Sequence, residues 1–313
     1  MADSAYLLEV LNLCQYFSSG HGKNKLVVKA VDDVSFGVKP AETFGLVGES
    51  GCGKTTTGRT IIRLYDPTSG KVNFSGRDIS GKMNAQLRRY LTDNIAMIFQ
   101  DPIESLNPRM TIEEIVGEGL KVRGHKDSGD IREKVVEMLK KVGLTEEHAT
   151  RYPHEFSGGQ RQRIGIARAI IVRPKMIIAD EPVSALDVSI QAQVINLLND
   201  LKEELGLTIL FIAHNLSVVK YFSDRIGVMY YGQLVEIARG DDLYSKPLHP
   251  YTRALLSAIP EPNPITEKTR KRVDYNPERD HDYTINKPSM VEIEPEHFIY
   301  CSPMELESYR EII

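Results

Sequence analysis

The chain has 313 residues, of which 41% are hydrophobic and 26% are charged, and its formal net charge is −4. The length is ample for one large domain or two smaller ones, and the composition is typical of a globular protein. A slightly acidic balance argues against a protein that binds nucleic acid through a general basic field. The first residues lack the basic start of a signal peptide, and no run of roughly 18 apolar residues could span a bilayer.

The three cysteines, Cys14, Cys52 and Cys301, are far apart in the sequence. This odd number and wide spacing predict neither a disulfide framework nor a zinc or iron–sulfur site.

The N-terminal third reads as strands around one glycine-rich turn. Residues 6–17 and 28–40 are expected to be strands, the second interrupted at Gly37 and Pro40. The segment 42–65 predicts an apolar strand, a glycine-rich turn and a helix. A small hairpin at 68–79 and a buried strand at 94–101 follow.

The middle of the chain alternates helices and strands. Amphipathic helices are expected at 111–122, 130–144 and 155–170, followed by a strand at 175–182, a helix at 189–205, a strand at 207–214 and an edge hairpin at 225–237. This alternation predicts an α/β fold with a parallel sheet core and an antiparallel β edge.

Composition marks the domain boundaries. We expect a core formed by residues 1–101 and 173–240, with an inserted α-helical subdomain at 102–172. A C-terminal extension covers 241–313, and within it the proline- and charge-rich segment 261–288 is expected to be extended or irregular.

A phosphate-binding loop follows the strand in segment 42–65. The sequence GESGCGKT fits the pattern G-x-x-x-x-G-K-[ST]. Its glycines allow backbone N–H groups to surround a phosphate at the positive end of the next helix, while the lysine reaches the β- and γ-phosphates and the threonine hydroxyl binds Mg²⁺. The expected nucleotide-binding residues are Gly48, Glu49, Ser50, Gly51, Cys52, Gly53, Lys54, Thr55 and Thr56.

Two carboxylates follow the apolar run of the strand at 175–182. Strand ends deliver side chains to the edge of an α/β sheet where ligands bind. We expect Asp180 to hold Mg²⁺ through water and Glu181 to act as the general base on the attacking water. Taken alone, this pair is better explained as a solvated turn, but together with the phosphate loop the functional interpretation is preferred.

The segment EFSGGQRQRIGIARAI, residues 155–170, begins a helix with two glycines. Ser157 is expected to cap the helix, and the bare N–H groups of Gly158 and Gly159 allow a phosphate to come close. Ile164, Ala167 and Ile170 fall on one face and should anchor the helix. A capped helix with a flexible start remains the alternative.

These motifs, in this order, resemble the ATPase subunits of ABC transporters over about the first 240 residues. Besides the motifs above, the resemblance rests on Gln100 after NIAMIF, on SALD at 184–187 and on FIAHN at 211–215. It implies a P-loop, RecA-like core, with 1–240 as the ABC ATPase domain, and it implies ATP and Mg²⁺ as ligands.

The resemblance also implies individual roles. Gln100 would contact Mg²⁺ and the water, His214 the γ-phosphate, and Asp187 would link the two ATP sites of a dimer. Ser157, Gly158, Gly159 and Gln160 would face the ATP held by the partner ATPase subunit. An aromatic residue should stack on adenine; alignment favours Phe17 over Tyr16, and packing of either residue in the core is the alternative.

Further stretches, among them QDPIESLNPRMT and KPLHPYTRALLSAIP, resemble the oligopeptide/dipeptide subfamily, and specifically its F-type ATPase subunit. The resemblance implies a peptide importer at the cytoplasmic face of the membrane. Its partners would be a second ATPase subunit in a head-to-tail heterodimer, two transmembrane permease subunits and an extracellular or periplasmic peptide-binding protein. Close relatives carry nickel or other small solutes.

Some members hold an iron–sulfur cluster near the C-terminus, but only Cys301 is present here, so none is expected.

Soluble ABC ATPases of DNA repair or translation are the second class to weigh. These proteins usually carry a coiled-coil insertion, zinc modules or two cassettes. Here the segment between Gln100 and Phe156 is short and has no heptads, and the chain is slightly acidic. We therefore expect no nucleic-acid partner.

Overall fold

The computed structural model describes residues 5–20, 26–259 and 272–311. The chain forms two compact units. Unit 1 comprises Met1–Val38, Thr43–Ser80 and Ala213–Ile313, and unit 2 comprises Lys39–Glu42 and Gly81–Ile212. This division groups the strands at 94–101, 175–182 and 207–214 with the helical segment 102–172, so its boundaries differ from those of the expected core and subdomain, which stay a prediction.

Unit 1 contains a small antiparallel sheet in the order β2-β1-β4-β5. Its strands are β1 (Leu8–Ser19), β2 (Leu26–Val38), β4 (Ser69–Phe74) and β5 (Arg77–Asp78). β2 runs through Gly37 and ends before Pro40, so only the proline limits the strand, since it lacks an N–H donor. The expected hairpin at 68–79 is confirmed as β4 and β5.

The second group of strands in unit 1 follows the order β11-β12-β10-β9-β3. These strands are β3 (Thr43–Val47), β9 (Arg225–Tyr230), β10 (Gln233–Arg239), β11 (Ser289–Glu294) and β12 (His297–Cys301). β3 and β9 are parallel, and the others pair antiparallel. The expectation that the hairpin at 225–237 forms the edge is wrong, because β12 pairs with β10 and β11 pairs with β12.

The helices of unit 1 follow its strands. They are α1 (Lys54–Ile61), α7 (Leu216–Phe222), α8 (Gly240–Ser245), α9 (Pro250–Ser257), α11 (Pro277–Asp280) and α12 (Pro303–Arg310). Leu248, Ile299, Cys301 and Tyr309 form a small buried cluster that joins α12 and β12 to the segment before α9. Apart from α11, residues 272–288 carry no helix or strand, as expected; residues 261–271 of the predicted irregular segment lie outside the described residues.

Unit 2 has three parallel strands in the order β8-β7-β6. They are β6 (Ile95–Ile98), β7 (Met176–Asp180) and β8 (Thr208–Ala213). Every residue of β7 and β8 is buried, as in a parallel sheet covered on both faces. The predicted parallel α/β core is therefore confirmed.

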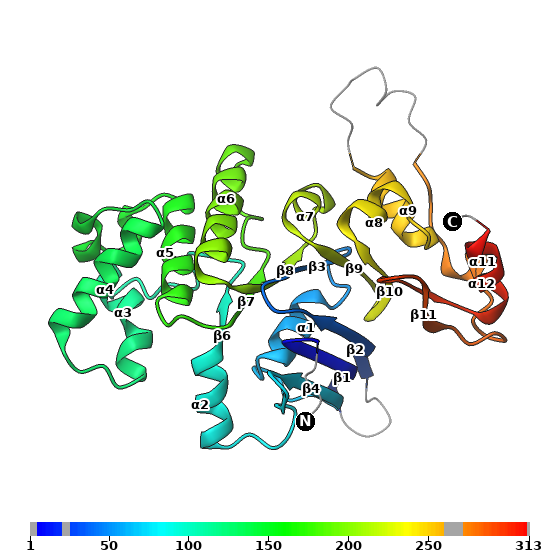
Figure 1. Ribbon diagram of the computed structural model, residues 1–313, viewed down its shortest axis with the longest axis horizontal. Helices are drawn as coiled ribbons and strands as arrows, with labels where there is room; N and C mark the ends of the chain where they lie inside the picture. The colour runs from blue at the N-terminus through cyan, green and yellow to red at the C-terminus, as the bar shows by residue number, and fades with distance from the viewer. Residues whose placement is uncertain (1–4, 21–25, 260–271, 312–313) are drawn as a thin grey trace. The chain divides into compact units, whose positions relative to one another are not determined.

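Helices make up the rest of unit 2. They are α2 (Ala85–Asn94), α3 (Ile112–Val122), α4 (Ser128–Lys141), α5 (Gly158–Ile170) and α6 (Val188–Leu205), with short 3₁₀ helices η2 (Glu146–Thr150) and η3 (Pro153–Glu155). Figure 1 shows α3, α4 and α5 gathered in one bundle. The sequence did not predict α2, whose N-cap is the side chain of Asn84.

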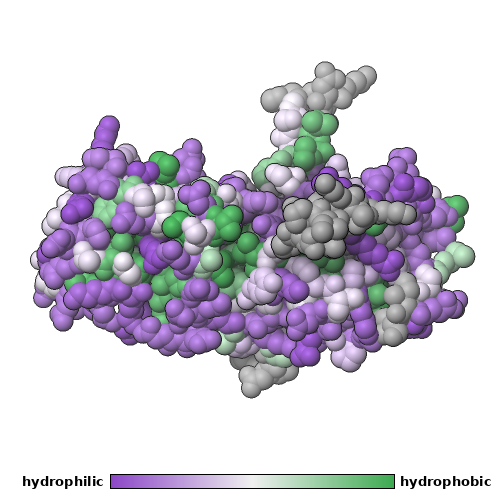
Figure 2. Space-filling model, turned by 90° about the horizontal axis from the view of Figure 1, so that it is seen from above, coloured by the Kyte–Doolittle hydropathy of each residue, from purple (hydrophilic) through white to green (hydrophobic). Residues whose placement is uncertain are grey.

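The surface of the chain is mainly polar on the face shown in Figure 2, where hydrophobic residues lie in small groups among hydrophilic ones. Within the described part of the chain, no helix combines the length and apolar character needed to cross a membrane.

Candidate functional site

The phosphate loop occupies the turn between β3 and α1 in unit 1. β3 is buried throughout its length, so its C-terminal end is fixed in position. Gly53 has φ 107°, and a Cβ atom added there would lie 2.1 Å from the carbonyl oxygen of Ala30. At Gly48 the equivalent atom would lie 2.1 Å from the carbonyl oxygen of Met229. Neighbouring backbone therefore excludes any side chain at both glycines.

The Lys54 ammonium holds this loop together. Its Nζ donates to the carbonyl oxygens of Gly48, at 2.8 Å, and of Glu49, at 2.9 Å. Lys54 is only 4% exposed, so its charge lies inside the curl of the loop. Glu49, Ser50 and Gly51 are exposed on the outside. The loop thus surrounds one positive charge with its backbone, which suits a phosphate.

The remaining predicted residues of the loop differ in exposure. Thr55 and Thr56, in the first turn of α1, are half-buried. Cys52 is buried, and burial is the main reason that the pKa of its thiol lies above the ordinary value. The Cys52 Sγ lies 3.8 Å from the Lys54 Nζ. Because this side chain packs inside the loop, Cys52 can reach a ligand only through its backbone.

Two aromatic residues compete for contact with a base. The Tyr16 hydroxyl donates to the Asp32 carboxylate, and the Lys29 ammonium lies 5.3 Å from the centroid of the Tyr16 ring. Phe17 is 39% exposed and makes a T-shaped contact with Tyr65, at a centroid distance of 5.3 Å, whereas Tyr16 is half-buried. Phe17 is thus the more accessible of the two aromatic side chains, which supports the choice of Phe17 over Tyr16.

In unit 2 the structure brings Gln100 and Glu181 together. Gln100 follows β6 and Glu181 follows β7, which pair in parallel. The Gln100 Nε2 donates to a carboxylate oxygen of Glu181 at 2.9 Å. Glu181 has φ 45°, an uncommon conformation for a residue with a side chain. It is held there because its N–H donates to Ile212 O at 2.9 Å and its carbonyl accepts from the Ser184 hydroxyl at 3.0 Å.

The last residue of β7, Asp180, is fully buried. A carboxylate so far from solvent needs a compensating charge or donors. His214 directly follows β8 and is exposed.

The glycine-containing start of α5 has the predicted cap. The Ser157 hydroxyl accepts from the Gln160 N–H at 3.4 Å, and the Gln160 side chain accepts from the Ser157 N–H at 3.0 Å. The predicted anchoring face is confirmed, since Ile164, Ala167 and Ile170 are all buried.

The start of α5 also lies beside the start of α6, which the sequence did not predict. A Cβ atom at Gly159 would come within 2.6 Å of the Ile190 Cγ2, and one at Gly158 would lie 3.6 Å from the Leu186 Cδ2. Asp187, the N-cap of α6, sits between these two contacts in the sequence and is exposed. The start of α5, with Ser157, therefore lies close to the start of α6, with Asp187.

The predicted residues fall into groups. Unit 1 holds Phe17, the phosphate loop and His214, and unit 2 holds Gln100, Asp180, Glu181, the start of α5 and Asp187. One contact of the phosphate loop was missed: the Tyr251 hydroxyl accepts from the Glu49 N–H at 3.2 Å. The HPYT sequence around Tyr251 is the available signal, but by itself this motif indicates only the subfamily.

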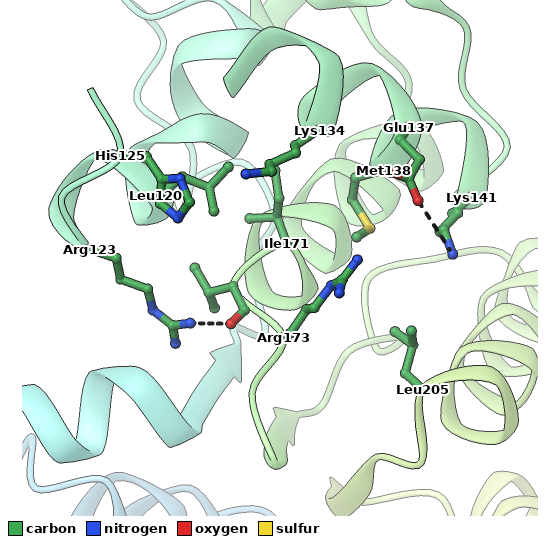
Figure 3. A pocket seen from close by; sticks show the side chains of 11 residues that line it. Leu120, Arg123, His125, Lys134, Glu137, Met138, Lys141, Ile171, Arg173 and Leu205 are labelled. Atoms are coloured by element: carbon green, nitrogen blue, oxygen red, sulfur yellow. Dashed lines mark hydrogen bonds and ion pairs between the residues drawn. The ribbon is translucent and has the colours of Figure 1, made fainter. Parts of the chain in front are cut away.

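A cavity of about 440 Å³ lies elsewhere in unit 2, between α3, α4 and the C-terminal ends of α5 and α6. Three cations that line it are paired, and Figure 3 draws two of these pairs. Arg123 donates to Val172 O, while Lys141 lies 3.9 Å from Glu137. Lys134 donates to Asp130 at 2.7 Å. The two lysine pairs compensate positive charge within α4, and the Arg123 bond joins the end of α3 to the segment after α5.

The predicted magnesium ligands have suitable chemistry. A hydroxyl, an amide and a carboxylate supply the hard oxygen donors that Mg²⁺ prefers, with the remaining positions left to phosphate and water. The amide nitrogen of Gln100 donates a hydrogen bond to Glu181, so the amide oxygen points away from this hydrogen bond. No group of three or more His, Cys, Asp or Glu residues that could hold a metal by themselves occurs in the described ranges.

Comparison with known proteins identifies the family. Residues 31–184 match the family model described as ABC transporter, and residues 235–284 match the one described as oligopeptide/dipeptide transporter, C-terminal region. The oligopeptide transport ATP-binding protein OppF of Bacillus subtilis (strain 168) is 54% identical over 304 residues, covering 97% of this chain and 98% of that protein. The dipeptide transport ATP-binding protein DppF of Lactococcus lactis subsp. cremoris (strain MG1363) is 49% identical over 313 residues, covering 99% and 98%.

Solved structures agree on the fold. The ATP-binding cassette MJ0796, in a dimeric post-hydrolysis state bound to ADP and Pi, matches with a TM-score of 0.67 at 30% identity, covering 74% of this chain and 98% of that chain. CbiO1 from Clostridium perfringens, part of the ABC transporter complex cbiONQ, matches with a TM-score of 0.68 at 26% identity, covering 78% and 92%. The chain therefore belongs to the ABC transporter family, as an ATPase subunit of its oligopeptide/dipeptide branch.

Proposed function

We propose that this chain binds ATP with Mg²⁺ and hydrolyses it to drive import of oligopeptides or dipeptides, at the cytoplasmic face of the membrane. The relatives named as oligopeptide and dipeptide transport ATP-binding proteins support the cargo class, and so does the match of residues 235–284 to the C-terminal region of such transporters. Motifs common to all ABC ATPases would not distinguish this cargo from others.

The hydrogen bond between Gln100 and Glu181 carries the proposal for hydrolysis. It fixes one carboxylate oxygen of Glu181 at 2.9 Å from an amide donor, at the ends of two adjacent parallel strands. The left-handed backbone of Glu181 costs of order 1–3 kcal/mol, which is characteristic of functional positions. Glu181 would accept the proton of the attacking water, and Gln100 would orient that water.

The other roles follow from the groups described above. Lys54 and the N–H groups of the phosphate loop would bind the β- and γ-phosphates, Phe17 would stack on adenine and His214 would contact the γ-phosphate. Thr55, Gln100 and Asp180 would hold Mg²⁺, the last through water. When bound, Mg²⁺ supplies charge stabilisation to the phosphate oxygens.

The start of α5 is assigned to the nucleotide of a partner. Ser157, Gly158, Gly159 and Gln160 would face the ATP bound by a second ATPase subunit in a head-to-tail heterodimer, with Asp187 linking the two sites. The dimeric state of MJ0796 supports such pairing within the fold. Two permease subunits and an extracellular or periplasmic peptide-binding protein would complete the importer.

A Glu181→Gln variant tests the catalytic assignment. The amide keeps the shape of the side chain but cannot accept a proton, so ATP turnover by the assembled transporter should fall by about 10²–10⁴-fold. ATP binding should persist and trap a closed dimer, measured as retained radiolabelled ATP. Glu147→Gln, an exposed glutamate in η2, is the matched control. Undiminished turnover in Glu181→Gln would count against Glu181 as the base.

Uptake by the reconstituted transporter tests the cargo. Proteoliposomes containing all subunits and the binding protein would be offered a labelled pentapeptide, a labelled dipeptide or ⁶³Ni²⁺. ATP-dependent accumulation of a peptide is expected. Accumulation of nickel alone would overturn the assignment of the cargo while leaving the ATPase role intact.

A further inference from the structure

The aromatic side chain of Tyr251 connects the C-terminal region to the phosphate loop. Tyr251 lies in the first turn of α9, where the His249 side chain caps the helix by accepting from the Tyr251 N–H at 3.1 Å. It is 2% exposed, and its hydroxyl accepts a hydrogen bond from the Glu49 N–H at 3.2 Å. A residue 202 positions away in the chain is thereby attached to the backbone of the loop.

The peptide group that Tyr251 contacts is also a partner of Lys54. The Glu49 N–H and the Gly48 carbonyl belong to the same planar peptide unit. Its carbonyl accepts from the Lys54 Nζ at 2.8 Å, while its N–H donates to Tyr251. Rotation of this unit would break both bonds at once. The Tyr251 hydroxyl therefore helps to set the position of the Lys54 ammonium without touching it.

The Tyr251 ring is held from two other segments. Its centroid lies 4.4 Å from that of Tyr230, at the end of β9, and 5.5 Å from that of Tyr275. Tyr230 and Tyr275 also contact each other, at 5.1 Å. Burial raises the pKa of the Tyr251 hydroxyl, so it stays neutral at physiological pH. These contacts leave the hydroxyl little freedom to move away from the loop.

A buried carboxylate anchors the start of α9 to the strands behind it. Glu236 of β10 is fully buried and accepts from the Leu248 N–H at 2.9 Å and the His249 N–H at 3.0 Å. The same carboxylate lies 2.8 Å from the Nε2 of His297 in β12. Tyr251 is thus fixed to a framework that includes the C-terminal hairpin β11–β12.

We propose that Tyr251 is a positioning residue of the phosphate loop, through which the C-terminal region sets the affinity of this subunit for ATP. This inference rests on the proposed function, because it requires that Lys54 bind the phosphates of ATP. The hydroxyl acts on the Gly48–Glu49 peptide unit, and that unit acts on Lys54.

Tyr251→Phe in the full-length chain removes the acceptor and keeps the ring. Losing one hydrogen bond of this kind should weaken Mg-ATP binding about three- to tenfold, measured by isothermal titration calorimetry. Tyr309→Phe, which alters another buried tyrosine of the C-terminal region, should leave the affinity unchanged. Wild-type affinity in Tyr251→Phe, or an equal loss in both variants, would overturn the inference.

A double-mutant cycle with Lys54→Ala distinguishes positioning from general loosening of the fold. If Tyr251 acts through Lys54, Tyr251→Phe should cost no further affinity once the ammonium is gone. Additive losses would instead show an effect independent of Lys54 and contradict the proposal. If the wild-type chain fails to bind ATP, the proposed function itself is contradicted. This outcome is distinct from both results of the double-mutant cycle.

Discussion

Gly53 and Gly51 share a positive φ in the phosphate loop but differ in their surroundings. φ is 107° at Gly53 and 82° at Gly51. A Cβ at Gly53 would meet the Ala30 carbonyl oxygen at 2.1 Å, whereas one at Gly51 would meet no atom within 4 Å. Gly51→Ala should therefore cost only the strain of the backbone, about 1–2 kcal/mol in the free energy of unfolding. Gly53→Ala should cost clearly more, because the loop or the part of β2 around Ala30 must shift.

Urea unfolding and ATP titration of the two variants check this difference. ATP affinity should fall further in Gly53→Ala than in Gly51→Ala, since displacement of the loop moves Lys54. Equal effects in both variants would show that backbone strain, rather than the approach of Ala30, makes glycine necessary at position 53.

At the scale of residues, sequence patterns predicted the types of side chain in the loop but not their partners. The pattern G-x-x-x-x-G-K-[ST] found Lys54 because the spacing itself encodes the turn. It could not find Tyr251, because the Glu49–Tyr251 bond depends on how a segment 202 residues away returns to the loop. The left-handed backbone of Glu181 could not be predicted from the sequence either, since glutamate has no local preference for that conformation.

At the scale of elements, the start of α5 allows stability to be separated from function. Gly158→Ala introduces a methyl group 3.6 Å from the Leu186 Cδ2, an ordinary contact, in a helical position where alanine is favoured over glycine. The free energy of unfolding should be unchanged or rise by up to about 1 kcal/mol. If a partner's phosphate approaches this backbone, ATP turnover of the assembled transporter should nevertheless fall at least tenfold.

The outcome that contradicts this prediction is a stable Gly158→Ala variant with full turnover in the complete transporter. It would mean that Gly158 only begins a helix. Gly159→Ala is unsuitable as the primary test, because its Cβ would lie 2.6 Å from the Ile190 Cγ2 and the packing of α5 on α6 would change as well.

Local periodicity predicted most elements near the site and missed those that depend on distant partners. β7 and β8 are apolar apart from Asp180 and Thr208, and the burial of their apolar residues follows directly from composition. β11 and β12 lie beyond the irregular segment. Every residue of β11 is at least partly exposed, and β12 forms a ladder with β10 some 60 residues away. Only that pairing shows that the β9–β10 hairpin is not an edge.

At the scale of the whole molecule, both units combine a parallel α/β arrangement with chemistry at strand ends. β3 ends at the phosphate loop, β6 at Gln100 and β7 at Glu181, in keeping with ligand binding at the carboxyl ends of parallel strands. This topology explains why the phosphate loop, Gln100 and Glu181, which are far apart in the sequence, each follow the carboxyl end of a parallel strand.

The global stability should fall in mild acid because of His249, whose imidazole is buried under the C-terminal region. Its Nδ1 accepts from the Tyr251 N–H, and its Nε2 is buried without a hydrogen-bond partner among the described residues. Burial first, and then His281 and Arg253, lower its pKa from 6.5 to about 3. Glu236 contacts the backbone of His249 and not its imidazole, since the carboxylate accepts from the His249 N–H.

In the unfolded chain this imidazole binds a proton below about pH 6.5, whereas in the folded chain it stays neutral until about pH 3. The free energy of unfolding should therefore be unaffected by His249 above pH 6.5. It should decrease as the pH falls below that value, with a contribution to the slope that approaches about 1.4 kcal/mol per pH unit. Urea unfolding at pH values from 5 to about 7.5 measures this slope.

His249→Asn is the informative variant, because asparagine retains a side-chain cap for α9 but does not titrate. Its dependence on pH should be shallower than that of the wild type, and its stability at pH 5 should approach or exceed the wild-type value. His154→Asn, at an exposed histidine of η3, should retain the wild-type slope. An unchanged slope in His249→Asn would mean that other groups cause the loss of stability in acid.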